Sequence, residues 1–147
     1  MTFQGGENFW LYVPLILWIG GIFYLSSNKG SISNTSRFLS PIFAFLFPDK
    51  EADKLKTYHL YFRKLCHFFG YGILAVWAIL AYYNSTLMFL ANYWYLSAFL
   101  TVVFVASADE IKQSLYANRV GSVSDVVLDS IGGLTAILLF QLFQYFF

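Results

Sequence analysis

The sequence has few charged residues. Lys, Arg, Asp and Glu make up 12% of its 147 residues, whereas a soluble globular domain carries about 25%. Hydrophobic residues make up 59% of the chain and aromatic residues 22%. So few charges cannot cover a water-facing surface, so the composition predicts an integral membrane protein. The net charge of +1 provides no basic surface for nucleic acid, and no nucleic-acid partner is expected.

Cysteine and the common catalytic motifs are also scarce or missing. The single cysteine, Cys66, excludes an internal disulfide and a paired-cysteine metal site, and we expect it to act as a small packing residue. The sequence contains no GxSxG, Walker loop or HExxH motif. These absences argue against the hydrolase, nucleotide-binding and metalloprotease classes that those motifs define.

Long apolar segments predict an all-α integral membrane fold. We expect one domain over 1–147, with four transmembrane helices in an antiparallel bundle, at about 9–25, 66–83, 87–106 and 125–147. The first run has only 17 residues, but it lacks the basic start and cleavage site of a signal peptide. The apolar stretch at about 38–48 is too short to span and contains prolines. It is expected to be an interfacial or re-entrant segment.

The polar residues set the expected helix boundaries. A helix is predicted from about Leu55 to Tyr83, and another from Leu87 through Gln113. Segments 26–37 and 117–122 have loop composition. Ser122 stands three residues before Asp125, a spacing typical of a capping box at the start of the last helix.

Polar side chains gather where the apolar segments end, mainly in the stretch 105–133. Residues four apart share a face of a helix, and the predicted helices alternate in direction. The polar faces of three helices therefore fall at one membrane level, where side chains avoid lipid and converge inside the bundle. The candidate site residues are Arg63, Lys64, His67, Tyr71, Asp109, Glu110, Gln113, Arg119, Asp125 and Asp129.

These residue types suggest separate roles. Arginine and lysine suit phosphate or carboxylate, so Arg63, Lys64 and Arg119 are predicted anion contacts. Carboxylates and imidazole transfer protons, so His67, Asp109 and Glu110 are the predicted catalytic or proton-handling group. The ligand-binding set is completed by Tyr71, Gln113, Asp125 and Asp129 as orienting residues. No spacing matches a metal signature, so no metal or other cofactor is predicted. A divalent cation held by Asp109, Glu110, Asp125 and Asp129 beside His67 remains an open alternative.

The same residues resemble the VanZ-like family of small bacterial membrane proteins. The resemblance covers nearly the whole chain and rests on three parts: Arg63-Lys64-x-x-His67-x-x-x-Tyr71, Asp109-Glu110-x-x-Gln113, and Arg119-x-Gly-Ser-x-x-Asp125-x-x-x-Asp129-x-x-Gly132. The pair Ser26-Ser27 also looks like the family's serine pair after the first span, although Asn28 stands where Gln is usual. The resemblance implies a four-helix membrane unit. The family's name comes from a member associated with resistance to teicoplanin-type glycopeptide antibiotics.

Three functions fit this pattern. The first is binding of an anionic envelope lipid or a glycopeptide-related ligand such as a cell-wall precursor, with a link to glycopeptide resistance. The second is a membrane-embedded hydrolase or transferase acting on a phospholipid or polyprenyl phosphate, and whether the protein is an enzyme stays open. The third is a structural subunit with a charge-paired helix network. Membrane lipids are expected partners, and an oligomer is compatible with the sequence.

The distribution of basic residues predicts the orientation. Seven of the nine Lys and Arg residues lie in 26–64, and the other two, Lys112 and Arg119, lie between the last two spans. Both segments belong to one side of the predicted bundle. The positive-inside rule places that side, and the polar site, in the cytoplasm of a bacterium, with the protein multi-pass in its cytoplasmic membrane.

Overall fold

The protein is all-helical over the residues described by the computed structural model, which are 9–27, 32–48, 51–116 and 121–146. A short 3₁₀ turn, η1 (Phe9–Leu11), leads into α1 (Tyr12–Leu25). It is followed by α2 (Ile32–Leu46), α3 (Ala52–Tyr83), α4 (Met88–Asn92), α5 (Trp94–Ser114) and α6 (Val123–Phe146). No strand occurs in these ranges. The predicted all-α fold is confirmed.

Three of the helices are long and apolar enough to cross a membrane: Asp53–Tyr83, Trp94–Ser114 and Val123–Phe146. The apolar helix Phe9–Leu25 is shorter. Large apolar side chains such as Phe104, Leu139 and Phe143 are well exposed on the outside of these helices. Outward apolar side chains are expected where lipid, rather than water, is the solvent.

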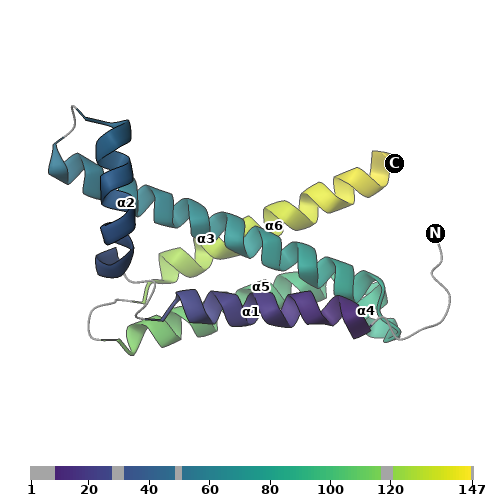
Figure 1. Ribbon diagram of the computed structural model, residues 1–147. Helices are drawn as coiled ribbons and strands as arrows, with labels where there is room; N and C mark the ends of the chain where they lie inside the picture. Colours follow the sequence, from purple (N-terminus) through teal and green to yellow (C-terminus); the bar gives the residue numbers. More distant parts are fainter. Residues whose placement is uncertain (1–8, 28–31, 49–50, 117–120, 147) are drawn as a thin grey trace.

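The helices form an elongated bundle with two distinct ends (Figure 1). At one end, the Tyr12 hydroxyl donates a hydrogen bond of 2.9 Å to Ser85, which follows α3. At the other end, the Ser26 hydroxyl donates one of 2.7 Å to Asp109 near the end of α5. We call this second end the polar end. Alternation of the helix directions brings the end of α1, the first half of α3, the end of α5 and the start of α6 together there.

Helix α2 lies across the bundle rather than along it (Figure 1). Its described contacts are with α3 alone, where Phe43 packs edge-on against Phe62 at 6.0 Å. The predicted loop over 26–37 is wrong from Ile32 onward, because α2 begins there. The apolar half of α2 packs on α3 and holds that half in a helix. Because a helix is easier to extend than to start, it continues back through 32–37, whose composition alone favours a loop.

The continuous helix predicted over 87–113 is interrupted at Tyr93, which separates α4 from α5. Trp94 begins α5, is buried, and packs edge-on against Tyr83 at 5.9 Å and Phe140 at 5.4 Å. This aromatic packing aligns α5 with α3 and α6, and the preceding turn is left as a separate short helix. Helix α3 also begins three residues earlier than the predicted Leu55.

Glycines bring α6 into backbone contact with α3. A Cβ atom on Gly132 would overlap the carbonyl oxygen of Phe68, and one on Gly133 would come within 2.7 Å of the Val102 side chain. Small residues at such positions let membrane helices approach closely. Phe68 follows His67 directly, and Gly132 follows Asp129 by one turn. The close approach therefore sets the distance between these two polar residues.

Candidate functional site

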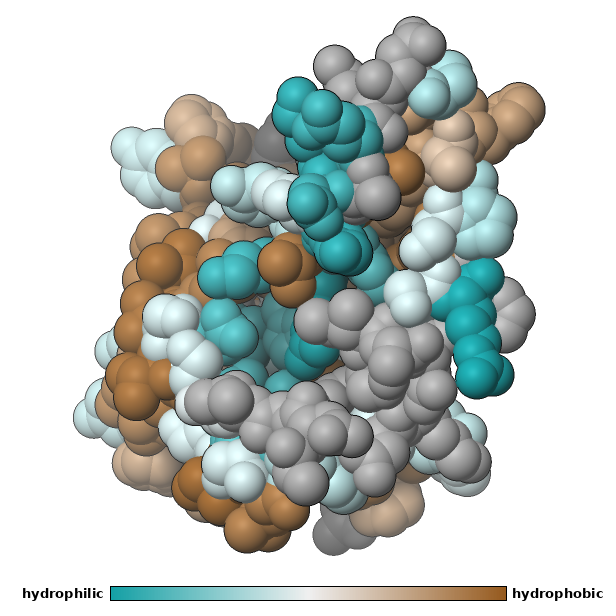
Figure 2. All heavy atoms as spheres, turned by 90° about the vertical axis from the view of Figure 1, so that its left-hand side faces the viewer, coloured by the Kyte–Doolittle hydropathy of each residue, from teal (hydrophilic) through white to brown (hydrophobic). Residues whose placement is uncertain are grey.

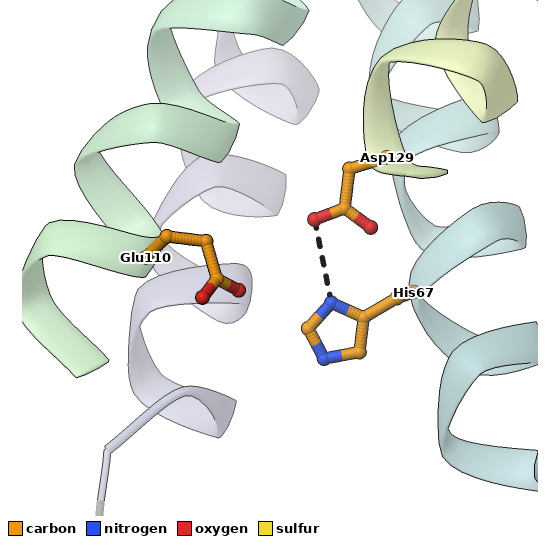
Figure 3. Close-up of side chains that lie close together, drawn as sticks. All are labelled: His67, Glu110 and Asp129. Atoms are coloured by element: carbon orange, nitrogen blue, oxygen red, sulfur yellow. Dashed lines mark hydrogen bonds and ion pairs between the residues drawn. The ribbon is translucent and has the colours of Figure 1, made fainter. Parts of the chain in front are cut away.

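Three polar side chains from three helices converge at the polar end (Figure 3). His67 comes from α3, Glu110 from α5 and Asp129 from α6, and one potential ligand atom of each lies within 4.8 Å of the others. The Nδ1 atom of His67 is 3.4 Å from Oδ2 of Asp129. Asp129 is fully buried and Glu110 is only 5% exposed, whereas the His67 side chain is 20% exposed. His67 therefore forms the exposed edge of the cluster.

Asp109 is held by a second set of hydrogen bonds beside this cluster. Its Oδ2 atom accepts hydrogen bonds from the Ser26 hydroxyl at 2.7 Å and from the Gln113 amide at 3.0 Å. The side-chain amide oxygen of Gln113, Oε1, accepts a hydrogen bond of 3.1 Å from Arg63. Gln113 thus joins the guanidinium of α3 to the carboxylate of α5, and Ser26 ties the end of α1 to the same carboxylate.

Glu110 fixes the start of the last helix. The backbone N–H of Ser122 donates a 2.8 Å hydrogen bond to Oε2 of Glu110, and Gln113 donates a longer one of 3.3 Å to Oε1. In a capping box the residue three positions later would accept from this N–H. The predicted role of Asp125 in such a box is therefore wrong, because Glu110 of α5 is the acceptor.

Lys64 and Asp125 lie at the periphery of the site. Their side chains are 3.6 Å apart and are 54% and 33% exposed. Exposed ion pairs of this kind contribute little to stability. Arg119, the third predicted anion contact, lies outside the described residues.

Buried polar atoms without partners surround the convergence point. Among the described residues, the Tyr71 hydroxyl, Oδ1 of Asp109 and Oδ1 of Asp129 make no hydrogen bond. Tyr71 stacks on His67 with 6.4 Å between the ring centroids. Native proteins rarely leave such atoms unsatisfied, and each one suggests a ligand, a water or an ion.

A half-open groove of about 640 Å³ runs between α1 and α3 and ends at the site. Its walls are mainly apolar, and its polar lining consists of Ser26, Arg63, His67 and Tyr71. Cys66 also lines it and is exposed, so it does not pack in the core as expected. Figure 2 faces the polar end and shows hydrophilic side chains around a recess. The groove is within the size range of small-molecule pockets.

Nine of the ten predicted site residues lie in described segments, and they gather at one end of the bundle. Two contributors were not predicted as site residues. Ser26 was noted only for its serine pair, and Ser122 only as a helix cap and as part of the third motif. Both donate hydrogen bonds to carboxylates of another helix, and sequence spacing carries no signal for such contacts.

The fold and the site define an all-helical, multi-pass membrane protein with a buried polar site at one end of its bundle. The chain belongs to the VanZ/LLP1 family, whose family model matches residues 9–144. This confirms the resemblance read from the three polar motifs. No curated protein and no solved structure matches the chain.

Proposed function

We propose that this protein binds an anionic envelope lipid in the groove between α1 and α3, with the lipid phosphate at the polar end. The proposal rests on an apolar groove that leads directly to the half-buried Arg63. The groove offers separate surfaces for the two chemically different parts of a lipid, the acyl chain and the headgroup.

The apolar part of the groove fits an acyl chain. Its walls include Gly21, Ile22 and Leu25 of α1, together with Phe69, Gly70 and Ile73 of α3. The lined stretch of α3, 62–73, extends for about 16 Å at 1.5 Å per residue. A Cβ atom on Gly21 or Gly70 would meet nothing within 4 Å, so these two positions leave the groove open.

The polar part of the groove fits a phosphate. Arg63 donates one hydrogen bond, to Gln113, among the described residues, and its remaining N–H groups are available to a ligand. Guanidinium groups bind phosphate through paired hydrogen bonds. The partly exposed Lys64 lies beside Arg63 in sequence and adds positive charge.

Native mass spectrometry of the purified protein with phosphatidylglycerol and phosphatidylcholine tests the proposal. We expect the wild type to retain the anionic lipid preferentially, and Arg63→Gln to lose this preference. Gly21→Leu fills the groove and should weaken retention about tenfold, which corresponds to about 1.4 kcal/mol. Gly20→Leu is the matched control, because Gly20 also has open space but does not line the groove.

Equal retention of both lipids by the wild type would overturn the proposal, as would equal effects of Gly21→Leu and Gly20→Leu. Variants that only melt earlier, with unchanged lipid retention, would support the structural-subunit alternative. A lipid-linked cell-wall precursor also joins an apolar chain to a phosphate. Binding of such a precursor is how the site would affect glycopeptide resistance. Expression should then raise the inhibitory concentration of teicoplanin, and Arg63→Gln should abolish the rise.

We place the polar end on the cytoplasmic side of the bacterial cytoplasmic membrane. The seven basic residues in 26–64 support this placement, as do Lys112 and Arg119. A reporter that is active only outside the cytoplasm should be active when fused to the end of the chain, which lies on the opposite side. Activity of a cytoplasm-restricted reporter at that position would reverse the orientation.

An enzymatic function is the second candidate, favoured by the His67–Asp129 pair. A carboxylate beside one imidazole nitrogen orients the ring as a general base, and His67 also lines the groove. The candidate reaction is hydrolysis or transfer at a lipid phosphate. Phosphate or headgroup release from phosphatidylglycerol or a polyprenyl phosphate tests it. Turnover that His67→Gln abolishes without loss of lipid retention would establish the activity, and absence of turnover in the wild type would refute it.

A further inference from the structure

The cluster of His67, Glu110 and Asp129 has the composition of a metal site. One imidazole and two carboxylates come from three helices, and their potential ligand atoms lie within 4.8 Å of one another. Imidazole suits zinc and other transition metals, and carboxylate oxygens also bind zinc. The three side chains point toward a shared space in Figure 3.

The distance between His67 and Asp129 is close to that between two ligands of one zinc ion. At 3.4 Å, Nδ1 and Oδ2 are farther apart than in a good hydrogen bond, which is about 2.7–3.2 Å long. Two ligands bound tetrahedrally to zinc, each at about 2.0–2.2 Å, are about 3.4 Å apart. The cluster as a whole has to contract by on the order of 1 Å to reach that geometry. The 3.3 Å hydrogen bond from Gln113 to Glu110 is weak enough to permit this movement.

The unpartnered oxygen of Asp129 is a second observation in favour of an ion. Asp129 is 0% exposed, and its Oδ1 atom has no hydrogen-bond partner among the described residues. Leaving a buried acceptor unsatisfied is energetically costly. A cation bound to both oxygens of this carboxylate would remove that cost.

Charge balance agrees with the geometry. Asp109, Glu110 and Asp129 are buried, and none of them has a Lys or Arg ion-pair partner among the described residues. Arg63 reaches this group only through the Gln113 side chain. The charges of the three carboxylates, the Arg63 guanidinium and one divalent cation sum to zero when His67 is neutral. Buried charge is tolerated when it is compensated in this way or bound to a metal.

We infer that His67, Glu110 and Asp129 bind a divalent transition-metal ion of the zinc type. Ser122 and Gln113 hold Glu110 from behind, as outer residues commonly hold metal ligands. Three protein ligands leave one coordination position open. His67 also lines the groove, so the cluster borders the groove. The inference is independent of lipid binding.

Zinc content of the full-length protein tests the inference. Protein purified in detergent is stripped with EDTA, loaded with Zn²⁺, desalted and measured by inductively coupled plasma mass spectrometry. We expect one zinc per wild-type chain, and at least about tenfold weaker uptake in Asp129→Asn and Glu110→Gln. Asp125→Asn is the matched control, because Asp125 lies one turn earlier on α6 but pairs with Lys64 outside the cluster. It should bind zinc as the wild type does.

Two further measurements distinguish loss of zinc binding from loss of folding. Zinc should raise the melting temperature of the wild type and Asp125→Asn, and should leave that of Asp129→Asn unchanged. Co²⁺ bound in place of zinc should give a visible absorption band that His67→Gln removes. Absence of stoichiometric zinc in the wild type would overturn the inference. So would undiminished uptake in every folded variant of the three ligands, or an equal loss in Asp125→Asn.

Discussion

Gly132 of α6 lies against the carbonyl oxygen of Phe68 in α3, with no room for a Cβ atom between them. His67 precedes Phe68, and Asp129 lies one turn before Gly132. The backbone contact therefore determines how far apart the imidazole and the carboxylate stand. A residue without functional groups sets the geometry of the candidate site.

Gly132→Ala should destabilise the protein, because the added methyl group meets a rigid backbone carbonyl and pushes α3 and α6 apart. Overpacking of this kind costs about 1–3 kcal/mol, which should appear as a lower melting temperature in detergent. The variant should also lose zinc uptake, because the His67–Asp129 distance grows.

Gly72→Ala provides the control for this prediction. A Cβ atom at Gly72 would lie 3.5 Å from the Gly132 carbonyl oxygen, which is an ordinary van der Waals distance. The Gly72 variant should therefore melt close to the wild type. Equal destabilisation by the two substitutions would mean that helix propensity or flexibility, rather than the close contact, explains the effect.

Ser26→Ala should destabilise the polar end, because it removes one of the two hydrogen bonds that Asp109 accepts among the described residues. Ser26 is buried, and a hydrogen bond to a charged group contributes about 1.5–3 kcal/mol. Chemical or thermal unfolding in detergent measures the loss. Ser27→Ala is the control, since Ser27 bonds only the Tyr24 carbonyl of the preceding helix among the described groups and is more exposed than Ser26. If both variants unfold alike, the Asp109 contact is not what stabilises this end.

Lys112→Met should loosen the last turn of α1. The Lys112 ammonium group donates a 2.6 Å hydrogen bond to the Phe23 carbonyl oxygen and lies 5.5 Å from the centre of the Phe23 ring. A cation at a helix C-terminus satisfies a free carbonyl and the helix dipole, and its loss should cost about 1 kcal/mol. Hydrogen exchange should speed up in Ile22–Leu25. Lys56→Met, which removes only an exposed pair with Asp53, should leave this region unchanged.

Breaking the Lys64–Asp125 pair should have little effect on stability. Both side chains are partly exposed, and the Lys64 Nζ and Asp125 Oδ1 atoms are 3.6 Å apart. Such pairs contribute less than about 1 kcal/mol. A double-mutant cycle with Lys64→Ala and Asp125→Ala should give a coupling energy within that limit. A larger value would place this pair in the buried network rather than at its edge.

The protein class and the positions of the main helices were predictable from the sequence. A low share of charge and long apolar runs identify a membrane protein, because an α-helix that crosses lipid satisfies its backbone hydrogen bonds internally and presents apolar side chains to the lipid. Helix α3 ends at Tyr83 as expected, and α6 begins at Val123, two residues before the predicted span and directly after the predicted cap Ser122. The gathering of polar side chains at one end of the bundle was predictable for the same reason, since polar groups at membrane depth are costly and have to converge.

The partners within the site were decided only by the tertiary structure. Helical spacing places Glu110 on a face of α5, but the offset between α5 and α6 makes the Ser122 N–H its donor. In the same way, the docking of α1 brings Ser26 to Asp109, and packing on α3 extends α2 back to Ile32. Such contacts depend on the rotation and offset of whole helices. Those quantities are set by long-range packing, such as Gly132 against Phe68, and local sequence periodicity does not contain them.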